Sequence, residues 1–444
     1  MSALKRLALA TQAAVEAGLA RAGGEVVAVT PGLLRVAGLS PLVALGDLVG
    51  VESDDEANPA LGEVIRIDPD AVLVKPFDRD EGAAPGRACW RIGPHRLAPD
   101  LSWAGRVVDA LGRPVDGRGP MAVGPTQRAS VGDPPAPLTR ARVGARLATG
   151  VKAIDVFAPM VAGQRMGVFA GSGVGKSTLL SMLAAAADFD AVVVALVGER
   201  GREAREFLED SLGPARDRAV VVLATADESA MMRRLAPRTA VAVAEHFRDA
   251  GQSVLLIVDS ITRYAHALRE AALSAGEPPV ARGYPPSVFS DLPRLLERAG
   301  PGEEGTGSIT GVFSVLVDGD DHNDPVADAI RGALDGHLVL SRSIADEGRF
   351  PAIDLLRSIS RLAAKAWSAD ERKLVASLKA MIARFEDTRD LRLMGGYAAG
   401  ADPDLDRAVA LTPKLYGFCA QSPGESVARD AFRDLAATLR GEAA

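Results

Sequence analysis

The chain has 444 residues, of which 48% are hydrophobic and 25% charged, so most of it is expected to fold, into two or three domains. Its formal net charge is −7, and only 4% of its residues are aromatic. Both values argue against a nucleic-acid binder, because phosphate backbones attract positive charge and single strands stack on aromatic side chains. Cys89 and Cys419 lie too far apart to indicate a disulfide framework or a zinc site, which favours a reduced, cytoplasmic compartment.

Residues 2–22 are expected to form a helix. Leu4, Leu7, Val15 and Leu19 recur at helical spacing, and two glycines then end the pattern. Such a helix either packs on its own domain or docks on a partner protein or a lipid surface. We expect neither a signal peptide nor a membrane-spanning segment, because the apolar runs are too short and are interrupted by charge.

Short apolar segments separated by Pro, Gly and Asp follow in residues 23–98, a pattern typical of a small β-barrel or sandwich. The expected strands are Glu25–Val29, Leu33–Val36, Leu48–Glu52, Gly62–Ile67 and Ala71–Lys75. Residues 111–137 are rich in Pro and Gly, which predicts turns and a linker rather than a regular element.

From about Thr139 the pattern alternates between buried strands and helices, which predicts a parallel sheet with helices on its faces. The expected strands are Arg165–Ala170, Ala191–Val197, Ala219–Ala224, Val254–Asp259, Ser308–Leu316 and Gly336–Ser341. The expected helices are Lys176–Ala187, Arg202–Leu212, Met231–Ala250 and Pro293–Ala299. After about Arg361 the pattern is helical only, most clearly over Glu371–Asp390 and Pro403–Ala410.

The strongest functional signal is the sequence Ala-Gly-Ser-Gly-Val-Gly-Lys-Ser at residues 170–177, between an expected strand and an expected helix. This is the context of a phosphate-binding P-loop, although Ala170 stands where the strict pattern has Gly. Glycines let successive backbone N–H groups turn toward a phosphate, and the helix N-terminus adds partial positive charge. The residues expected to bind nucleotide are Gly171, Ser172, Gly173, Val174, Gly175, Lys176, Ser177 and Thr178. Lys176 would bridge the β- and γ-phosphates, and Ser177 would bind Mg²⁺.

Two carboxylates follow strands near the P-loop. Asp259 ends an apolar run, so it is expected at the carboxyl edge of the sheet, where it would bind Mg²⁺. Glu199 follows another such run and could polarise the attacking water. The residues alone leave a second possibility for Glu199, namely a surface salt bridge with a neighbouring arginine such as Arg200.

Read with their neighbours, these segments resemble the rotary-type ATPases over about residues 25–410. The resemblance rests on Gly150–Asp155, Gly163–Gly167, Ala226–Glu228, Met231–Arg234, Gly276–Pro279, Pro351–Asp354 and Ser358–Arg361. Within that superfamily the chain is similar to the type III protein-export ATPases, and most of all to their flagellar branch. That similarity rests on Val317–Asp321 with Asn323 and Pro325, on Ala327–His337, and on Gly395–Tyr397, where Gly396 replaces the usual Ala.

The resemblance implies an α/β P-loop NTPase core with a RecA-like parallel sheet, an N-terminal β-barrel and a C-terminal helical domain. It divides the chain into a docking helix (1–22), a small β-barrel (23–98), a P-loop ATPase domain (99–360) and a helical domain (361–444). It implies Mg-ATP hydrolysis, with Glu199 as catalytic carboxylate and Lys176, Arg200 and Arg263 at the phosphates. Arg361 matches an arginine supplied to the neighbouring subunit of a homohexamer. Phe350 and, less directly, Tyr416 are candidates for the adenine wall, and a core role for Phe350 stays open.

The implied partners are further copies of the chain, a regulator, a stalk protein, export substrates and their chaperones, but no nucleic acid. The implied location is cytoplasmic, at the inner face of the membrane, with the N-terminal helix as a possible lipid contact. An injectisome ATPase is an alternative. The catalytic subunit of a rotary proton-translocating ATPase is another, but we find no acidic rotor-contact run between Glu371 and Ala410. Glu199 argues against a ring subunit that only binds nucleotide, and the negative charge argues against a helicase.

Overall fold

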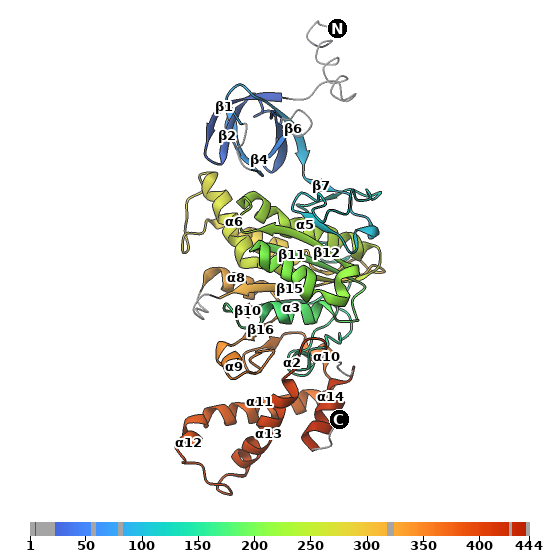
Figure 1. The fold of residues 1–444 in the computed structure, drawn as a ribbon, viewed down its shortest axis with the longest axis vertical. Helices are drawn as coiled ribbons and strands as arrows, with labels where there is room; N and C mark the ends of the chain where they lie inside the picture. The colour runs from blue at the N-terminus through green and yellow to red at the C-terminus, as the bar shows by residue number, and fades with distance from the viewer. Residues whose placement is uncertain are drawn as a thin grey trace.

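The computed structural model describes residue 5 and residues 23–54, 59–78, 83–317, 324–425 and 429–440. These form three successive tiers, with a β-barrel at one end, a central α/β domain, and helices at the other end (Figure 1). This is the fold class expected from the sequence. The expected N-terminal helix lies outside the described residues except for Lys5, and so does most of the Val317–Asp321 segment.

The first tier is a closed antiparallel barrel of six strands, ordered β1-β2-β5-β4-β3-β6, which settles the choice between barrel and sandwich. Its strands are β1 (Gly23–Thr30), β2 (Leu33–Ala37), β3 (Asp47–Val51), β4 (Ala60–Ile67), β5 (Ala71–Pro76) and β6 (Ala88–Pro94). Alternate side chains such as Val36, Val64 and Val72 are fully buried in its interior. The pattern therefore reflects the two-residue period of strands that bury one face.

The second tier is a nine-stranded sheet with the order β17-β16-β10-β15-β13-β11-β12-β8, and with β14 paired to β15. From β16 to β8 neighbouring strands are parallel, while β17 and β14 are antiparallel. The strands are β8 (Val107–Asp109), β10 (Arg165–Ala170), β11 (Ala191–Glu199), β12 (Ala219–Thr225), β13 (Ser253–Asp259), β14 (Gly300–Pro301), β15 (Ser308–Leu316), β16 (Gly336–Leu340) and β17 (Ile359–Ser360). Their apolar runs are buried on both faces, as parallel sheets require.

Helices cover both faces of this sheet. One face is packed by α2 (Lys152–Phe157), α3 (Lys176–Ala184) and α4 (Gly201–Glu206), which continues as a π-helical turn (Phe207–Ser211) and a 3₁₀ segment (Gly213–Arg218). The other is packed by α5 (Ala230–Asp249), α6 (Ile261–Ser274), α7 (Pro286–Glu297) and α8 (Pro325–Ala333). The prediction of a helix over Pro293–Ala299 was wrong about the residue at which this helix begins. The helix begins at Pro286, whose missing N–H costs nothing in the first turn, and Pro293 lies inside it.

The third tier consists of α11 (Ala369–Asp387), α12 (Arg389–Leu393), α13 (Pro403–Cys419) and α14 (Ala431–Arg440), joined to the sheet through α9 (Arg342–Asp346) and α10 (Ala363–Ala366). Helix α11 opens with a capping box, in which Ser368 and Glu371 bond each other's backbone N–H groups. The expected helix Pro403–Ala410 extends to Cys419, with Pro413 inside it. In the described part of the chain, no helix has the length and apolarity needed to cross a bilayer.

Short elements join the barrel to the sheet. They are a 3₁₀ turn (Leu101–Trp103) and the strands β7 (Arg96–Leu97) and β9 (Arg128–Ala129), which pair with each other. Strand β9 lies inside the segment expected to be a linker, which otherwise consists of turns and irregular chain. The barrel is also fixed to the central tier by polar contacts, among them a hydrogen bond from Ser229 to the carbonyl of Phe77.

Candidate nucleotide-binding site

The candidate site lies where three parallel strands end at the same edge of the sheet. The P-loop connects the end of β10 to the start of α3, and Asp259 and Glu199 stand at the ends of β13 and β11. The pairing of Leu196 with Asp259 brings those two strand ends side by side. Ligands bind at the carboxyl edge of open α/β sheets, so the geometry gathers the expected residues where a ligand is expected.

The P-loop has the backbone conformation that turns N–H groups inward. Gly173 and Gly175 have φ angles of 76° and 88°, which residues with a Cβ rarely adopt. Gly175 is the N-cap of α3, so the positive end of that helix faces the loop. Val174 is buried and anchors the loop, whereas Ser177 and Thr178 are exposed.

Lys176 is held between two carboxylates. Its ammonium group is ion-paired with Asp259, and its Nζ lies 3.7 Å from Oε1 of Glu199. Asp259 is buried and also accepts a hydrogen bond of 2.6 Å from the hydroxyl of Ser314. Because the P-loop lysine and the two strand-end acids meet in space, the sequence motifs form one site rather than three.

Glu199 lies at the end of β11 beside two cationic side chains, Lys176 and Arg263. Burial raises the pKa of its carboxyl, and the nearby charge of Asp259 raises it further, while Lys176 and Arg263 oppose this change. Nη1 of Arg263 lies 2.9 Å from Oε1 of Glu199 and also donates to the carbonyl of Gly198. Gly198 has a φ of 67°, and a Cβ there would lie 2.9 Å from Cδ of Arg263. Close approach of Arg263 to the strand end therefore requires glycine at this position.

Arg200 is not brought into this cluster. Its side chain is 79% exposed, and its closest charged partner is Glu203, at 3.9 Å. As the N-cap residue of α4, Arg200 lies where the chain turns away from the sheet. Of the two arginines expected near the phosphates, only Arg263 contacts the site.

Phe350 lies beside the P-loop. A Cβ on Gly175 would be 3.4 Å from Cδ1 of its ring. Because 45% of Phe350 is exposed, it is not a core residue of this chain. An exposed aromatic ring next to a phosphate loop is a surface on which a base can stack.

Tyr416 has other partners. Its hydroxyl donates to Oε1 of Glu386 at 2.5 Å, and the guanidinium of Arg349 lies 3.9 Å from its ring centroid. Burial and the Glu386 carboxylate raise the pKa of the Tyr416 phenol. The side chain thus joins the C-terminal helices to the segment that precedes Phe350.

Arg361 lies at the opposite edge of the sheet. It follows β17, and Ser360 pairs with Gly336 at the amino end of β16, whereas the P-loop begins beside Leu340 at the other end. These ends are four residue steps apart along β16, which is about 13 Å. Arg361 is exposed and lies at the end of the sheet remote from the P-loop of its own chain.

Two site residues were missed in the sequence. Nη2 of Arg342, at the start of α9, donates a hydrogen bond of 2.8 Å to the carbonyl of Ser172 and so fixes the P-loop from outside. Ser314, near the carboxyl end of β15, donates to the Asp259 carboxylate and so orients it. No sequence motif surrounds Arg342 or Ser314, so neither could be identified as a site residue from the sequence.

The donor set suits a magnesium ion that arrives with a nucleotide. The exposed hydroxyl of Ser177 and the carboxylate of Asp259 are hard oxygen donors, the type that Mg²⁺ prefers. Within the described ranges no group of three or more His, Cys, Asp and Glu residues could hold a metal alone. Two protein ligands, completed by phosphate oxygens and water, are the usual arrangement for Mg²⁺ in such sites.

Comparisons with known proteins identify a nucleotide-binding domain and a C-terminal domain in this chain. Residues 150–360 match the nucleotide-binding domain of the ATP synthase alpha/beta family, and residues 367–437 match the C-terminal domain of the type III secretion ATPase EscN. The flagellum-specific ATP synthase of Agrobacterium fabrum is 57% identical over 421 residues, 95% of this chain and 89% of that protein.

Solved structures give the same result. Assembled EscN from the type III secretion system of enteropathogenic E. coli is 38% identical, covers 94% of this chain and 100% of that chain, and superposes with a TM-score of 0.85. EscN in complex with its central stalk EscO is 37% identical, with the same coverage and TM-score. Fold and site therefore define a P-loop ATPase. The chain belongs to the flagellum-specific ATP synthases of the ATP synthase alpha/beta family.

Proposed function

We propose that the protein hydrolyses Mg-ATP as a homohexameric ring and thereby energises flagellar type III protein export. The observation that carries the proposal is the convergence of Lys176, Glu199 and Asp259 at the P-loop, because hydrolysis needs a phosphate contact, a base and a metal ligand at one point. The flagellar assignment draws on the relative named above.

In this proposal Lys176 contacts the β- and γ-phosphates, and Ser177 and Asp259 hold Mg²⁺. The bound metal would neutralise charge on the phosphates. When Lys176 turns to the phosphates, Glu199 loses one of its two cationic neighbours and keeps Arg263, which holds its carboxylate in place. Glu199 then orients the attacking water and accepts its proton.

Arg361 is proposed to act on the site of the adjacent subunit. It is exposed at the edge of the sheet remote from its own P-loop, so it can reach a phosphate only on another chain. An arginine supplied in this way stabilises charge on the transferring phosphoryl group and is worth ~10³–10⁵ in rate. A ring with sites between subunits follows from this role, and a homohexamer is the arrangement that we propose.

The proposed partners are a stalk protein, a regulator, export substrates and their chaperones. The stalk is suggested by the complex of EscN with its central stalk. The proposed location is cytoplasmic, at the inner face of the membrane, where ATP hydrolysis would release and unfold substrates at an export gate. Residues 1–22 are proposed as the docking helix.

The first test is genetic. Lys176 is replaced by Ala in the chromosomal copy, expression and folding of the variant are verified, and flagellar filaments are counted by electron microscopy. Loss of filaments supports nucleotide-dependent flagellar export. Normal filaments overturn the flagellar assignment and favour the injectisome, which secretion of injectisome effectors by the same strain would then test.

The second test concerns the ring. The total rate of ATP hydrolysis is measured against protein concentration, with the oligomeric state followed by sedimentation. The proposal predicts activity that rises more steeply than linearly as rings assemble. A strictly linear dependence in a monomeric protein would exclude a trans-acting arginine.

A further inference from the structure

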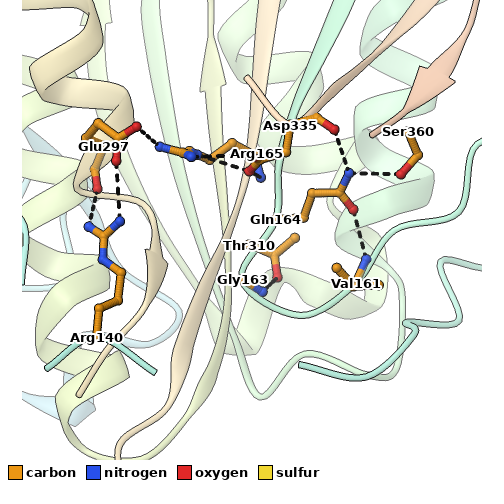
Figure 2. A network of polar contacts seen from close by, with 9 residues as sticks. All are labelled: Arg140, Val161, Gly163, Gln164, Arg165, Glu297, Thr310, Asp335 and Ser360. Carbon is orange, nitrogen blue, oxygen red and sulfur yellow. Dashed lines mark hydrogen bonds and ion pairs between the residues drawn. The ribbon is translucent and has the colours of Figure 1, made fainter. Parts of the chain in front are cut away.

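A chain of polar contacts runs from the segment that leads to the P-loop strand to Asp335 and Ser360 (Figure 2). Arg361 joins this chain through its backbone N–H, which donates to the carbonyl of Asp335. We propose that Gln164 is a positioning residue for Arg361, acting through Ser360 and Asp335. The inference rests on the proposed trans role of Arg361. It adds a residue outside the nucleotide site to the machinery that sets the rate of hydrolysis.

Gln164 is fully buried, and its amide group uses both its donors and its acceptor. Its Oε1 accepts from the backbone N–H of Val161 at 3.0 Å, which leaves the NH₂ group to face the other way. That group donates to the carbonyl of Asp335 at 3.2 Å and to the hydroxyl of Ser360 at 3.0 Å (Figure 2). One side chain thus joins the two segments that meet at Arg361.

Asp335 is held in place by Arg165. Its carboxylate accepts from the backbone N–H and the guanidinium of Arg165, at 3.0, 3.1 and 3.2 Å. Arg165 also pairs with Glu297 at the end of α7, where Arg140 donates to the carbonyl of Glu297 at 2.6 Å (Figure 2). Bidentate arginine–carboxylate pairs have restricted geometry, so Asp335 presents its carbonyl in a fixed position.

That carbonyl also holds Arg361. The backbone N–H of Arg361 donates to the carbonyl of Asp335 at 2.8 Å, next to the bond from Gln164. The guanidinium of Arg361 donates at 3.3 Å to the carbonyl of Arg331, in the last turn of α8, where helix carbonyls lack intrahelical partners. The backbone of Arg361 is therefore held by the carbonyl that Gln164 also contacts, and its side chain is held by the end of α8.

Position matters more for Arg361 than for most surface arginines. β17, which precedes it, has two residues, and the strand pairs with β16 through Gly336 and His337. So short an edge strand has few ladder bonds of its own, and the contacts of Gln164 with Ser360 and Asp335 add to them. A misplacement of about 1 Å in a catalytic geometry can cost ~10² in rate.

The test compares kcat and KM for Mg-ATP among variants, at protein concentrations where sedimentation shows full assembly. The variants are Gln164→Leu, Ser360→Ala, Arg361→Ala, the double variant Gln164→Leu/Arg361→Ala, and Thr310→Val. Thr310 is the matched control, because its buried hydroxyl accepts from the backbone N–H of Gly163, next to Gln164, at 3.0 Å (Figure 2). Among the described residues, no hydrogen bond joins the Thr310 side chain to Ser360 or Arg361. Folding of each variant is followed by thermal unfolding.

We expect Gln164→Leu to lower kcat by up to ~10²-fold and Ser360→Ala by a smaller factor, with KM within about twofold of the parent. Thr310→Val should keep the parental kcat. In the Arg361→Ala background, Gln164→Leu should cause no further loss, because the residue through which it acts is gone.

Equal losses from Gln164→Leu with and without Arg361 would overturn the inference, as would a kcat for Ser360→Ala no lower than that for Thr310→Val. If Gln164→Leu does not fold, the comparison of Ser360→Ala with Thr310→Val decides alone. An unchanged kcat for Arg361→Ala would instead reject the proposed role of Arg361, so the two failures are distinguishable.

Discussion

Lys176 and Asp259 form an ion pair at the centre of the nucleotide site, and both side chains are largely buried. The same ammonium group lies 3.7 Å from Oε1 of Glu199, so one positive charge stands between two acids. The P-loop lysine therefore has two tasks. It is placed to bind phosphate, and it compensates carboxylates that would otherwise repel each other in a poorly solvated position.

Lys176→Ala is expected to abolish ATP hydrolysis and also to lower the stability of the protein measured without nucleotide. Removing one partner of a buried pair leaves uncompensated charge, which costs on the order of 3 kcal/mol. Lys176→Arg keeps the charge and is the control, with a smaller loss of stability. Thermal unfolding of the two variants in nucleotide-free buffer makes the comparison. Equal unfolding midpoints for Lys176→Ala and the parent would show that the pair does not stabilise the fold.

The raised pKa of Glu199 predicts a particular pH profile. A general base must be deprotonated, and burial together with Asp259 keeps the proton on Glu199 to higher pH than the ordinary value of 4.5. The acid limb of kcat/KM, which reports groups of the free enzyme, should therefore lie above that value. Arg263→Gln removes a charge that lowers this pKa, so the limb should move to still higher pH.

Glu199→Gln is the matched control for that profile. It keeps the shape of the side chain, should lower kcat by ~10²–10⁴-fold, and should remove this limb from what activity is left. Binding of ATP should persist, because Lys176 and the P-loop are intact. A limb that stays in place in Arg263→Gln, or moves to lower pH, would contradict the assignment of Glu199 as the titrating base.

The parts of the site that could be predicted are those in which neighbouring residues act together. The P-loop is one contiguous segment. Glu199 and Asp259 end apolar runs, and ligands bind at the carboxyl ends of parallel strands, so the edge of the sheet at which both residues lie could be predicted. Spacing could not tell Arg263, which contacts Glu199, from Arg200, which points to solvent. The direction of a side chain at a helix start depends on the turn that precedes it.

Other features have no local signal. Arg342 is one of 51 lysines and arginines, and its bond to Ser172 depends on how α9 packs. Ser314 lies within an apolar strand, where a small residue is common and does not indicate a contact with Asp259. The two-residue strand β17 is too short for periodicity, and the contacts of Gln164 join segments almost 200 positions apart, as the separation of 196 between Gln164 and Ser360 shows. Only the folded chain brings these residues together.

Phe350→Ala is expected to raise KM for ATP by roughly 10-fold, because stacking of a base on an aromatic ring contributes ~1–3 kcal/mol. With 45% of Phe350 exposed, truncation should leave the fold intact. Phe350→Tyr keeps the ring and should keep KM. Tyr416→Ala should leave KM unchanged, since the guanidinium of Arg349 already lies over the ring that it removes. A rise in KM for Tyr416→Ala and none for Phe350→Ala would move the adenine wall to the C-terminal helices.

The position of Arg361 at the amino edge of the sheet predicts complementation between inactive subunits. Arg361→Ala keeps its own P-loop, Glu199 and Asp259, whereas Lys176→Ala keeps Arg361. Each variant alone should lose at least ~10³ of the parental rate. Mixed before assembly, they should regain activity, because an Arg361→Ala site beside a Lys176→Ala neighbour has every group it needs.

The control for this mixing experiment is the double variant Lys176→Ala/Arg361→Ala, which offers neither a working P-loop nor an arginine. Mixed with Arg361→Ala, it should restore nothing, although the rings that form are of the same size. Sedimentation of both mixtures checks that assembly is equal. If Arg361 served its own site, neither mixture would recover, because no chain would carry both groups. Recovery in the first mixture alone therefore distinguishes a trans-acting arginine from one that merely supports the sheet edge.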